Sequence, residues 1–290
     1  MAGTSNPPHE RVPAMQDPFA HCEQAVREAD KDRFLAALFA PANRRAALMA
    51  LYAFNAEIAR VREAIRDPMA GEVRLQWWRD AIERPGGGEA RANPIASAML
   101  DTIVRFRLPP AGLLALIEAR SFDLYNDPMP TLAALDAYAD KTSSALIDLA
   151  ARLLDAHADV ASVVRHAGRA YAIAGLLRAF PLHAARGQLY VPLELLQRHG
   201  ARPEDVFTRR ATPELVAALA ALRGVARAYL DVYHQASAAI PAAVAPALLP
   251  VALVPAYLGR LERLGHQPFK IADVPQWRRQ WILWRAARRA

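Results

Sequence analysis

The stretch YAFNAEIARVREAI, residues 52–65, carries charged residues at a spacing that could do chemistry. Residues three or four positions apart share one face of a helix, so carboxylates at that spacing can hold a divalent cation together. Here Glu57 and Glu63 alternate with Arg60 and Arg62. A guanidinium group repels a cation, and it either pairs with a carboxylate of its own helix or binds a phosphate group through two parallel hydrogen bonds. The stretch predicts an ion pair of Arg60 with Glu57 or Glu63, or else an anion site.

Helical patterns position this stretch and extend over most of the chain. From Ala47 to Ile65 apolar residues recur at spacings of three and four, which predicts one helix. Asp17 with Pro18 is typical of a helix start, and Asp67 with Pro68 ends the helix of residues 47–65. Further helices are expected over residues 71–84, 95–106, 111–125, 131–154, 160–180 and 213–239, and the glycine-rich residues 85–94 are expected to form a surface loop. No segment shows the alternation of a strand, so the fold class is predicted to be all-α.

The composition limits the classes of protein and of site. With 290 residues, 53% of them apolar, the chain can bury a substantial core. Its single cysteine, Cys22, excludes an internal disulfide and disfavours a cysteine-based zinc site. A net charge of +7 is compatible with nucleic acid or an anionic membrane surface, but the arginines are scattered and no binding motif accompanies them, so no nucleic-acid partner is expected. Residues 1–16 are expected to be a disordered leader without the apolar core of a secretion signal, which favours the cytoplasm, and residues 17–290 a single helical domain.

Two segments near the carboxyl end raise the question of a membrane. Residues 235–259 lack any charge, yet they contain four prolines, which favours a kinked, buried helix pair over insertion into a bilayer. Residues 276–290 place three tryptophans on one helix face with arginines around them, a pattern that suits contact with anionic lipid. The membrane-contact candidates are Trp277, Trp281, Trp284, Arg278, Arg279 and Arg285. The alternative is a terminal helix whose tryptophans pack on the core.

Three stretches together resemble the squalene/phytoene synthase family. They are DRFLAALFAPANRRAALMALYAFNAEIARVREAI, EVRLQWWRDAIE and AYAIAGLLRAFPLHAARGQLYVPLELLQRHG, and the resemblance extends over about residues 34–229. It implies an all-α isoprenoid synthase fold, in which antiparallel helices surround a central cavity. In active members two carboxylate-rich helix segments face each other across that cavity and hold Mg²⁺, which neutralises the departing diphosphate of a prenyl substrate.

The family's acidic positions are almost empty of acids in this chain. Carried over by the motifs, they fall on Ala59, Arg60 and Glu63 in the first segment and on Ala179, Leu182 and His183 in the second. Because Mg²⁺ prefers several oxygen ligands, the resemblance implies no metal, no cofactor and no catalytic residue here. The candidates for binding an isoprenoid or lipid are Phe34, Arg60, Arg178, Arg186 and Tyr190. For His183 a hydrogen-bonded structural role is favoured over acid–base catalysis.

Loss of the acids with retention of the surrounding motif also resembles one branch of the family, the mitochondrial assembly factors of respiratory complex I. That branch implies a pseudoenzyme that contacts complex I subunits or assembly intermediates, peripheral to the inner membrane on the cytoplasmic side. The alternative is an active prenyl transferase that condenses farnesyl or geranylgeranyl diphosphate and binds Mg²⁺ through other carboxylates, such as Asp136, Asp140 or Asp148.

Overall fold

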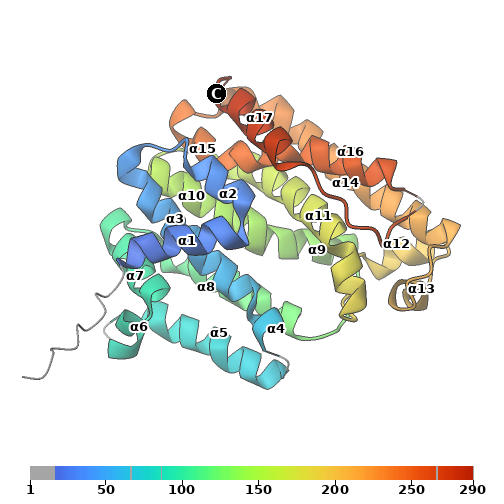
Figure 1. Ribbon diagram of the computed structural model, residues 1–290, viewed down its shortest axis with the longest axis horizontal. Helices are drawn as coiled ribbons and strands as arrows, with labels where there is room; N and C mark the ends of the chain where they lie inside the picture. The colour runs from blue at the N-terminus through green and yellow to red at the C-terminus, as the bar shows by residue number, and fades with distance from the viewer. Residues whose placement is uncertain (1–16, 66, 86, 266, 290) are drawn as a thin grey trace, which may run out of the picture.

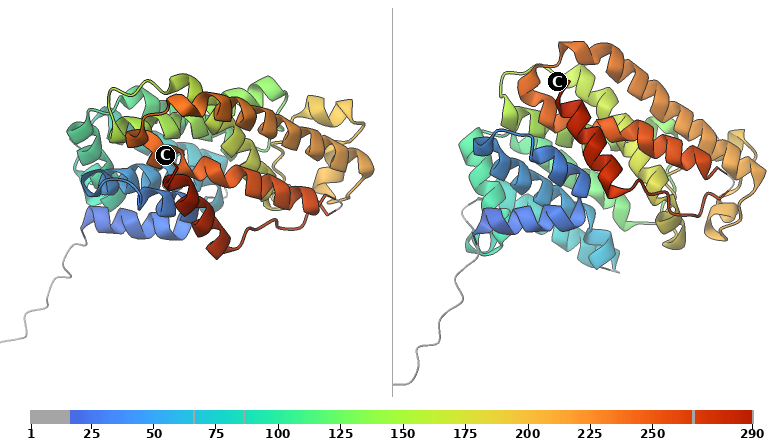
Figure 2. Two further views of the ribbon diagram at one scale, coloured as in Figure 1. Left: turned by 90° about the horizontal axis from the view of Figure 1, so that it is seen from above. Right: turned by 45° about the horizontal axis from the view of Figure 1, so that its top comes forward.

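Every regular element that the computed structural model describes is a helix (Figure 1). The structure describes residues 17–65, 67–85, 87–265 and 267–289, so the leader expected at residues 1–16 lies outside the described residues. Within the described ranges no strand occurs, which confirms the predicted all-α class. Helices α1, α3, α5 and α7 lie toward one end of the molecule and α12 and α13 toward the other (Figures 1 and 2).

Aspartates begin the first two helices. Asp17 accepts a hydrogen bond from the backbone of Phe19 at 3.1 Å and caps α1 (Pro18–Ala29), as the Asp-Pro pair predicted. Asp30 ends α1 and also caps α2 (Lys31–Ala37) by accepting from the backbone of Arg33 at 3.0 Å. Helix α2 was not among the expected helices, because its seven residues are too few to show a period of their own.

The helix expected over residues 47–65 is interrupted at Arg60. Helix α3 (Ala42–Ala59) begins after Pro41 and is buried along most of its length, and the short α4 (Val61–Ala64) follows. Arg60 stands between them at φ −98° and ψ 3°, and its backbone amide donates to the carbonyls of both Ala56 and Glu57. The prediction of one continuous helix was wrong at this residue.

The next helices agree with the sequence pattern except in the glycine-rich segment. Helix α5 (Pro68–Glu83) buries Trp78, and α7 (Pro94–Phe106) and α8 (Pro110–Leu124) follow. Residues 85–94 were expected to be only a loop, but they include α6 (Gly88–Ala92). Ala90 of this short helix packs with Ala81 and Leu100 in a small apolar cluster, and this tertiary contact stabilises a helical turn that glycine alone disfavours.

The helix expected over residues 131–154 contains a wider turn. It consists of α9 (Leu132–Ala139), a π-helical turn η1 (Asp140–Ser144) and α10 (Ala145–Leu154). Helix α11 (Ala161–Ala185) packs closely on that turn, because a Cβ added at Gly168 would lie 2.5 Å from the Cα of Ser144. The predicted end of α11 at Phe180 was wrong, since the helix continues through Pro181 to Ala185.

The last third of the chain covers α11. Short helices α12 (Leu193–Arg198) and α13 (Pro203–Phe207) lead to α14 (Pro213–Ala236), which packs along α11. The proline-containing segment then folds as a run of short turns, which are η2 (Ser237–Ala239), η3 (Ala242–Val244), α15 (Ala245–Leu248), η4 (Leu249–Leu253) and α16 (Val254–Arg263).

The apolar carboxyl-terminal segment is largely covered by the rest of the chain. Within the described residues one stretch, Ala242–Arg263, is long and apolar enough to cross a membrane, and 61% of its most apolar window is buried inside the fold. This burial agrees with the kinked, buried helix pair favoured by the prolines. Helix α17 (Gln276–Ala287) then packs across η4 and α2.

A continuous apolar core runs from Cys22 of α1 to Leu258 of α16. Burial raises the pKa of the Cys22 thiol to about 12, so this cysteine stays protonated at neutral pH. Beside the core, α3, α8, α11 and the η1 turn enclose a cavity of about 260 Å³.

Candidate ligand-binding cavity

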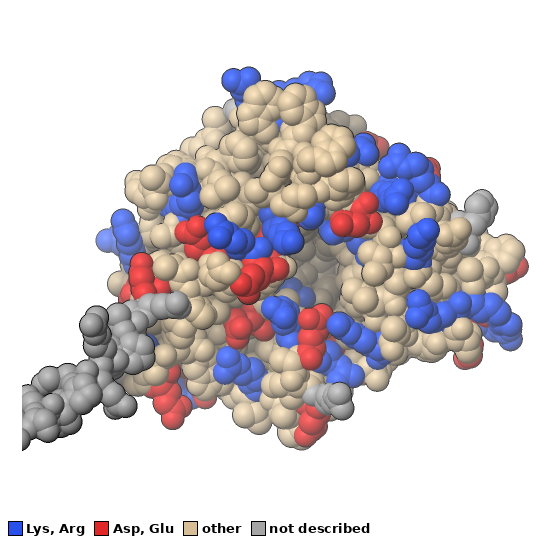
Figure 3. Space-filling view, in the orientation of Figure 1, with Lys and Arg blue, Asp and Glu red and all other residues tan. Residues whose placement is uncertain are grey.

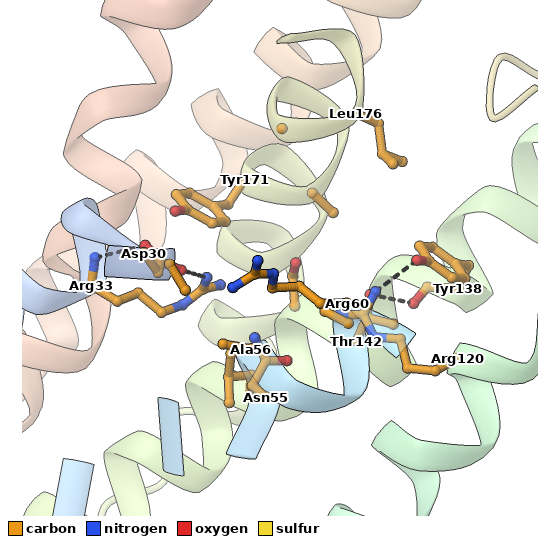
Figure 4. A pocket seen from close by; sticks show the side chains of 16 residues that line it. Asp30, Arg33, Asn55, Ala56, Arg60, Arg120, Tyr138, Thr142, Tyr171 and Leu176 are labelled. Carbon is orange, nitrogen blue, oxygen red and sulfur yellow. Dashed lines mark hydrogen bonds and ion pairs between the residues drawn. The ribbon is translucent and has the colours of Figure 1, made fainter. Parts of the chain in front are cut away.

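Three arginines from three different parts of the chain line the cavity. They are Arg33 of α2, Arg60 at the break between α3 and α4, and Arg120 of α8. Figure 4 shows the guanidinium groups of Arg33 and Arg60 pointing toward one another below Tyr171, with Arg120 beside Tyr138 at the other end. On the face seen in Figure 3 the surface is hollowed near its centre, with basic and acidic side chains around the hollow.

Arg33 is buried and fixed by its surroundings. Its guanidinium pairs with Asp30 at 2.5 Å and lies 4.9 Å from the ring centre of Tyr171. Burial raises the pKa of the Tyr171 hydroxyl, so the ring stays neutral and attracts the cation through its π face. Arg33 is therefore held in one position at the cavity wall.

Arg120 belongs to a buried polar network behind the cavity. Its Nη1 donates to Asp123 at 3.1 Å and to the Tyr138 hydroxyl at 2.9 Å. The hydroxyls of Tyr138 and Tyr190 both donate to Oδ1 of Asp123, at 2.8 and 2.7 Å. The Nε of Arg120 is buried and has no hydrogen-bond partner among the described residues.

Arg60 has the freedom that the other two arginines lack. Its side chain is 62% exposed, and its Nε lies 3.7 Å from Glu63, which is an ion pair but not a hydrogen bond. Glu57, the other predicted partner, instead accepts from Arg74 at 3.2 Å. The sequence prediction of an ion pair with Glu57 or Glu63 is thus confirmed for Glu63.

Glu63 connects the two segments that correspond to the acidic, metal-binding segments of the family. Besides Arg60 it binds Arg186, whose Nη1 donates to it at 2.8 Å from the end of α11. The one carboxylate at the six acidic positions is therefore already occupied by two guanidinium groups. Ala59 lines the cavity and contributes only a methyl group.

None of the three positions of the second segment lines the cavity. Ala179 is half-buried, Leu182 is exposed, and the ring of His183 packs at a tilt of 50° against that of Tyr190, with ring centres 4.6 Å apart. Burial lowers the pKa of His183 to about 4, so its imidazole is neutral near pH 7. The hydrogen-bonded structural role favoured from the sequence stays a prediction.

These residues do not fit Mg²⁺. The ion needs near-octahedral oxygen ligands, whereas the six positions offer one carboxylate, which two arginines already neutralise. In the described ranges of the chain no group of three or more His, Cys, Asp and Glu residues is placed to hold a metal ion.

The alternative carboxylates are committed to arginines instead. Asp136 and Asp140 both pair with Arg169, at 3.3 and 2.6 Å, and the Tyr229 hydroxyl donates to Asp136. Asp148 pairs with Arg152 at 2.7 Å. These pairs do not favour the alternative reading, in which the three aspartates would bind Mg²⁺.

The structure places four of the five ligand-binding candidates outside the cavity lining. Phe34 packs on the core, with the guanidinium of Arg27 over its ring. Tyr190 is buried, and its hydroxyl donates a hydrogen bond to Asp123. Arg178 lies 3.7 Å over the ring of Tyr257 and faces Asp32 at 3.8 Å. Arg186 sits at the outer end of α11 in its pair with Glu63, so of the five only Arg60 lines the cavity.

Sequence reasoning missed several cavity residues. Arg33 and Asn55 both lie in the family stretch that begins DRFLAALF, but no feature of the sequence was a reason to select either of them. Arg120 lies outside all three family stretches. The burial of Arg33 and of Asn55 could not be read from their types, because arginine and asparagine are usually exposed.

The carboxyl-terminal tryptophans form an exposed aromatic surface on α17. Trp277, Trp281 and Trp284 are 69%, 54% and 40% exposed, and the last two stack with ring centres 5.1 Å apart. Arg278 and Arg285 are exposed beside them. Arg279 is a correction to this group, since its side chain is turned inward and donates to Asp32 at 3.0 Å. In Figure 3 uncharged side chains lie over α17 at the top of the view, with basic side chains on both sides.

Comparisons with known proteins agree on the fold. A sequence model of squalene/phytoene synthase matches residues 26–285. The chain is 28% identical over 260 residues to NADH dehydrogenase (ubiquinone) complex I, assembly factor 6 of Rattus norvegicus, covering 89% of this chain and 78% of that protein. It is 30% identical over 217 residues to presqualene diphosphate synthase of Rhodopseudomonas palustris, covering 74% and 73%. The crystal structure of a squalene synthase from Alicyclobacillus acidocaldarius matches with a TM-score of 0.74 at 25% identity, over 87% of this chain and 95% of that one. The isoprenoid synthase fold implied by the resemblance is confirmed.

Proposed function

Because the chain belongs to the squalene/phytoene synthase family, we propose that it is a non-catalytic member that acts in the assembly of respiratory complex I at a membrane surface. The observation that carries the proposal is Glu63, the one acid at the six positions, which is neutralised by Arg186 at 2.8 Å. Without a set of oxygen ligands the protein has no means to hold Mg²⁺ against a departing diphosphate. In this proposal no metal and no cofactor takes part.

Similarity supports two different functions, and the geometry of the site favours the non-catalytic one. The relatives include complex I assembly factors and presqualene diphosphate synthases. An active synthase is the second candidate, and it is favoured only by that similarity, because Asp136, Asp140 and Asp148 are held by arginines. We therefore assign complex I subunits or assembly intermediates as partners, with an isoprenoid or lipid as an additional ligand.

Two measurements test the proposed function. Purified protein incubated with Mg²⁺ and farnesyl or geranylgeranyl diphosphate is expected to release no diphosphate and form no condensed product. Deletion of the gene is expected to lower the amount of assembled complex I in native gels of the membranes, and a plasmid copy is expected to restore it. Release of diphosphate by the purified protein, or normal complex I in the deletion strain, would contradict the proposal.

The membrane part of the proposal rests on α17. Exposed tryptophans favour the headgroup region of a bilayer, and arginines beside them attract anionic lipid. We propose that this binding is peripheral and on the cytoplasmic side of the inner membrane.

Binding to vesicles tests this surface. The double variant Trp277→Ala/Trp281→Ala is expected to bind vesicles containing phosphatidylglycerol roughly tenfold or more weakly, because each tryptophan loses apolar area that would be buried in the bilayer. A matched control is Met69→Ala/Val104→Ala, which removes two residues that are 69% and 70% exposed elsewhere on the surface. Equal loss in both double variants would refute a specific role of α17.

A further inference from the structure

We propose that the cavity binds the phosphate or diphosphate group of its ligand directly through guanidinium groups, without a metal ion, and recognises the headgroup alone. This inference deepens the proposed function, because it names the chemistry of the ligand in a protein that lacks the Mg²⁺ clamp. The site would consist of Arg33, Arg60 and Arg120, with Asn55 between them.

The charges around the cavity favour an anion. The lining includes three arginines and one carboxylate, Asp30. Arg33 pairs with Asp30 and Arg120 with Asp123, whereas the pair of Arg60 with Glu63 is long at 3.7 Å, so Arg60 is the weakly paired cation of the three. The guanidinium groups of Arg33 and Arg60 point toward one another in Figure 4, although like charges repel. A phosphate group between them would replace this repulsion with two attractive interactions, and guanidinium matches phosphate oxygens in a bidentate geometry.

Arg60 is the arginine that can respond to a ligand. It stands in the helix break, its side chain is 62% exposed, and its pair with Glu63 is long at 3.7 Å. Glu63 has a closer partner in Arg186, at 2.8 Å, so Arg60 can leave Glu63 without leaving that carboxylate alone. Arg33 and Arg120 are held at the wall, and Arg60 is placed to close on an anion from the open side.

Two buried polar groups at the cavity point independently to a ligand. Asn55 is only 8% exposed, lines the cavity, and its Oδ1 has no hydrogen-bond partner in the described part of the chain. A half-turn of the amide exchanges its oxygen and its NH₂ group, so Asn55 can donate to a phosphate oxygen. The buried Nε of Arg120 is a second donor without a partner. Buried polar groups are nearly always satisfied, which makes both groups candidates for contact with the anion.

The cavity is small and open on one side. Its volume of about 260 Å³ lies just below the roughly 300–1,000 Å³ of pockets that enclose a drug-sized ligand. A diphosphate is far smaller than such a ligand, whereas a farnesyl diphosphate has a fifteen-carbon tail in addition. We infer that any tail remains outside this cavity, so it adds little to the affinity.

Calorimetric titration of the full-length protein in EDTA tests the inference. Sodium pyrophosphate is expected to bind in the absence of Mg²⁺, and the variant Arg60→Ala is expected to bind it about 10- to 100-fold more weakly, because charge-assisted hydrogen bonds are lost. The matched control is Arg62→Ala. It removes the same charge from a residue two positions after Arg60 that does not line the cavity, and it is expected to bind pyrophosphate like the unaltered protein. Circular dichroism verifies that both variants are folded.

The ligands compared in the titration distinguish the sources of the phosphate group. The affinity for farnesyl diphosphate is expected to lie within about threefold of that for inorganic pyrophosphate. If a lipid headgroup enters the cavity, the variant Arg60→Ala is expected to bind vesicles containing phosphatidic acid more weakly than the unaltered protein does. No binding of pyrophosphate without Mg²⁺, or binding of farnesyl diphosphate alone, would overturn the inference. Equal binding by Arg60→Ala and Arg62→Ala would overturn it as well.

The outcomes separate this inference from the proposed function. If pyrophosphate fails to bind but the deletion strain still lacks complex I, only the anion site is wrong. If binding requires Mg²⁺ and the prenyl diphosphate is consumed, both proposals fail.

Discussion

Asp32 is the residue whose substitution is expected to disturb the fold most clearly. This carboxylate of α2 is 4% exposed and accepts from Tyr257 of α16 and, at 3.0 Å, from Arg279 of α17, while Arg178 of α11 lies 3.8 Å away. We refer to these four residues as the Asp32 cluster. One side chain thus joins α2 to three helices that are distant in sequence.

The magnitude follows from what the variant Asp32→Asn leaves behind. Two guanidinium groups, with side chains 28% and 12% exposed, lose their only anionic partner in the cluster. Removing one partner of a buried ion pair costs roughly 3–5 kcal/mol, because the remaining charge stays buried without compensation. Native domains are stable by about 5–15 kcal/mol in total, so the variant should retain a fold of much lower stability.

Urea unfolding followed by circular dichroism measures this loss. The control is Asp80→Asn, which removes the same charge from an exposed pair with Arg84 and is expected to leave the free energy of unfolding nearly unchanged. Limited trypsin digestion provides a second readout, since loosening of α17 should expose Lys270 and Arg278 to earlier cleavage. If Asp32→Asn unfolds at the same urea concentration as Asp80→Asn, the buried-charge reasoning is refuted.

Two further predictions test packing and protonation. Gly168→Ala is expected to lower the free energy of unfolding by about 1–3 kcal/mol, because its Cβ would collide with Ser144. The control Gly224→Ala, whose added Cβ would have no atom within 4 Å, should be neutral or stabilise α14 by up to about 1 kcal/mol. Thermal melts compare the two variants. Burial lowers the pKa of His183 from 6.5 to about 4, so the unfolded chain binds the extra proton first and stability is lost as pH falls from 6.5 toward 4. The loss attributable to His183 is up to about 3 kcal/mol, and His183→Gln should abolish that part of the pH dependence in urea titrations at pH 7 and pH 4.5. Identical pH dependence in the two proteins would contradict the assignment.

Local sequence signals were sufficient to predict most helices. They also showed which positions of the family motif lack an acidic residue. The Asp17-Pro18 start of α1 is a local capping interaction, and α7 and α8 follow local apolar spacing. The absence of acids at Ala59 and Ala179 is likewise visible in the sequence, because the family motif fixes which positions matter. These predictions need no knowledge of distant contacts.

Long-range contacts explain what the sequence did not show. Arg279 donates to a residue 247 positions earlier in the chain, so its side chain turns inward although its neighbours Arg278 and Trp277 are exposed. Arg60 interrupts a helix whose apolar spacing continues through Val61, and arginine itself favours helix. For Arg279 a long-range contact overrides the local pattern, whereas the contacts described for Arg60 are local.

The ion pair of Glu63 with Arg186 links the two segments that carry the metal-binding acids in active members of the family. Two acidic segments facing each other repel unless cations lie between them, so an active member depends on Mg²⁺ for this contact as well as for chemistry. In this chain Ala59 and Ala179 remove the repulsion, and one direct ion pair at 2.8 Å links the segments.

That ion pair cannot by itself hold the fold together. Its side chains are 44% and 42% exposed, and exposed ion pairs stabilise a protein little. The frame is held instead by the packing of α11 along α14 and on the η1 turn. The charge lining the cavity could therefore change from acidic to basic without loss of the fold. The sign of that charge determines whether a diphosphate is ionised through bridging cations or simply bound by guanidinium groups.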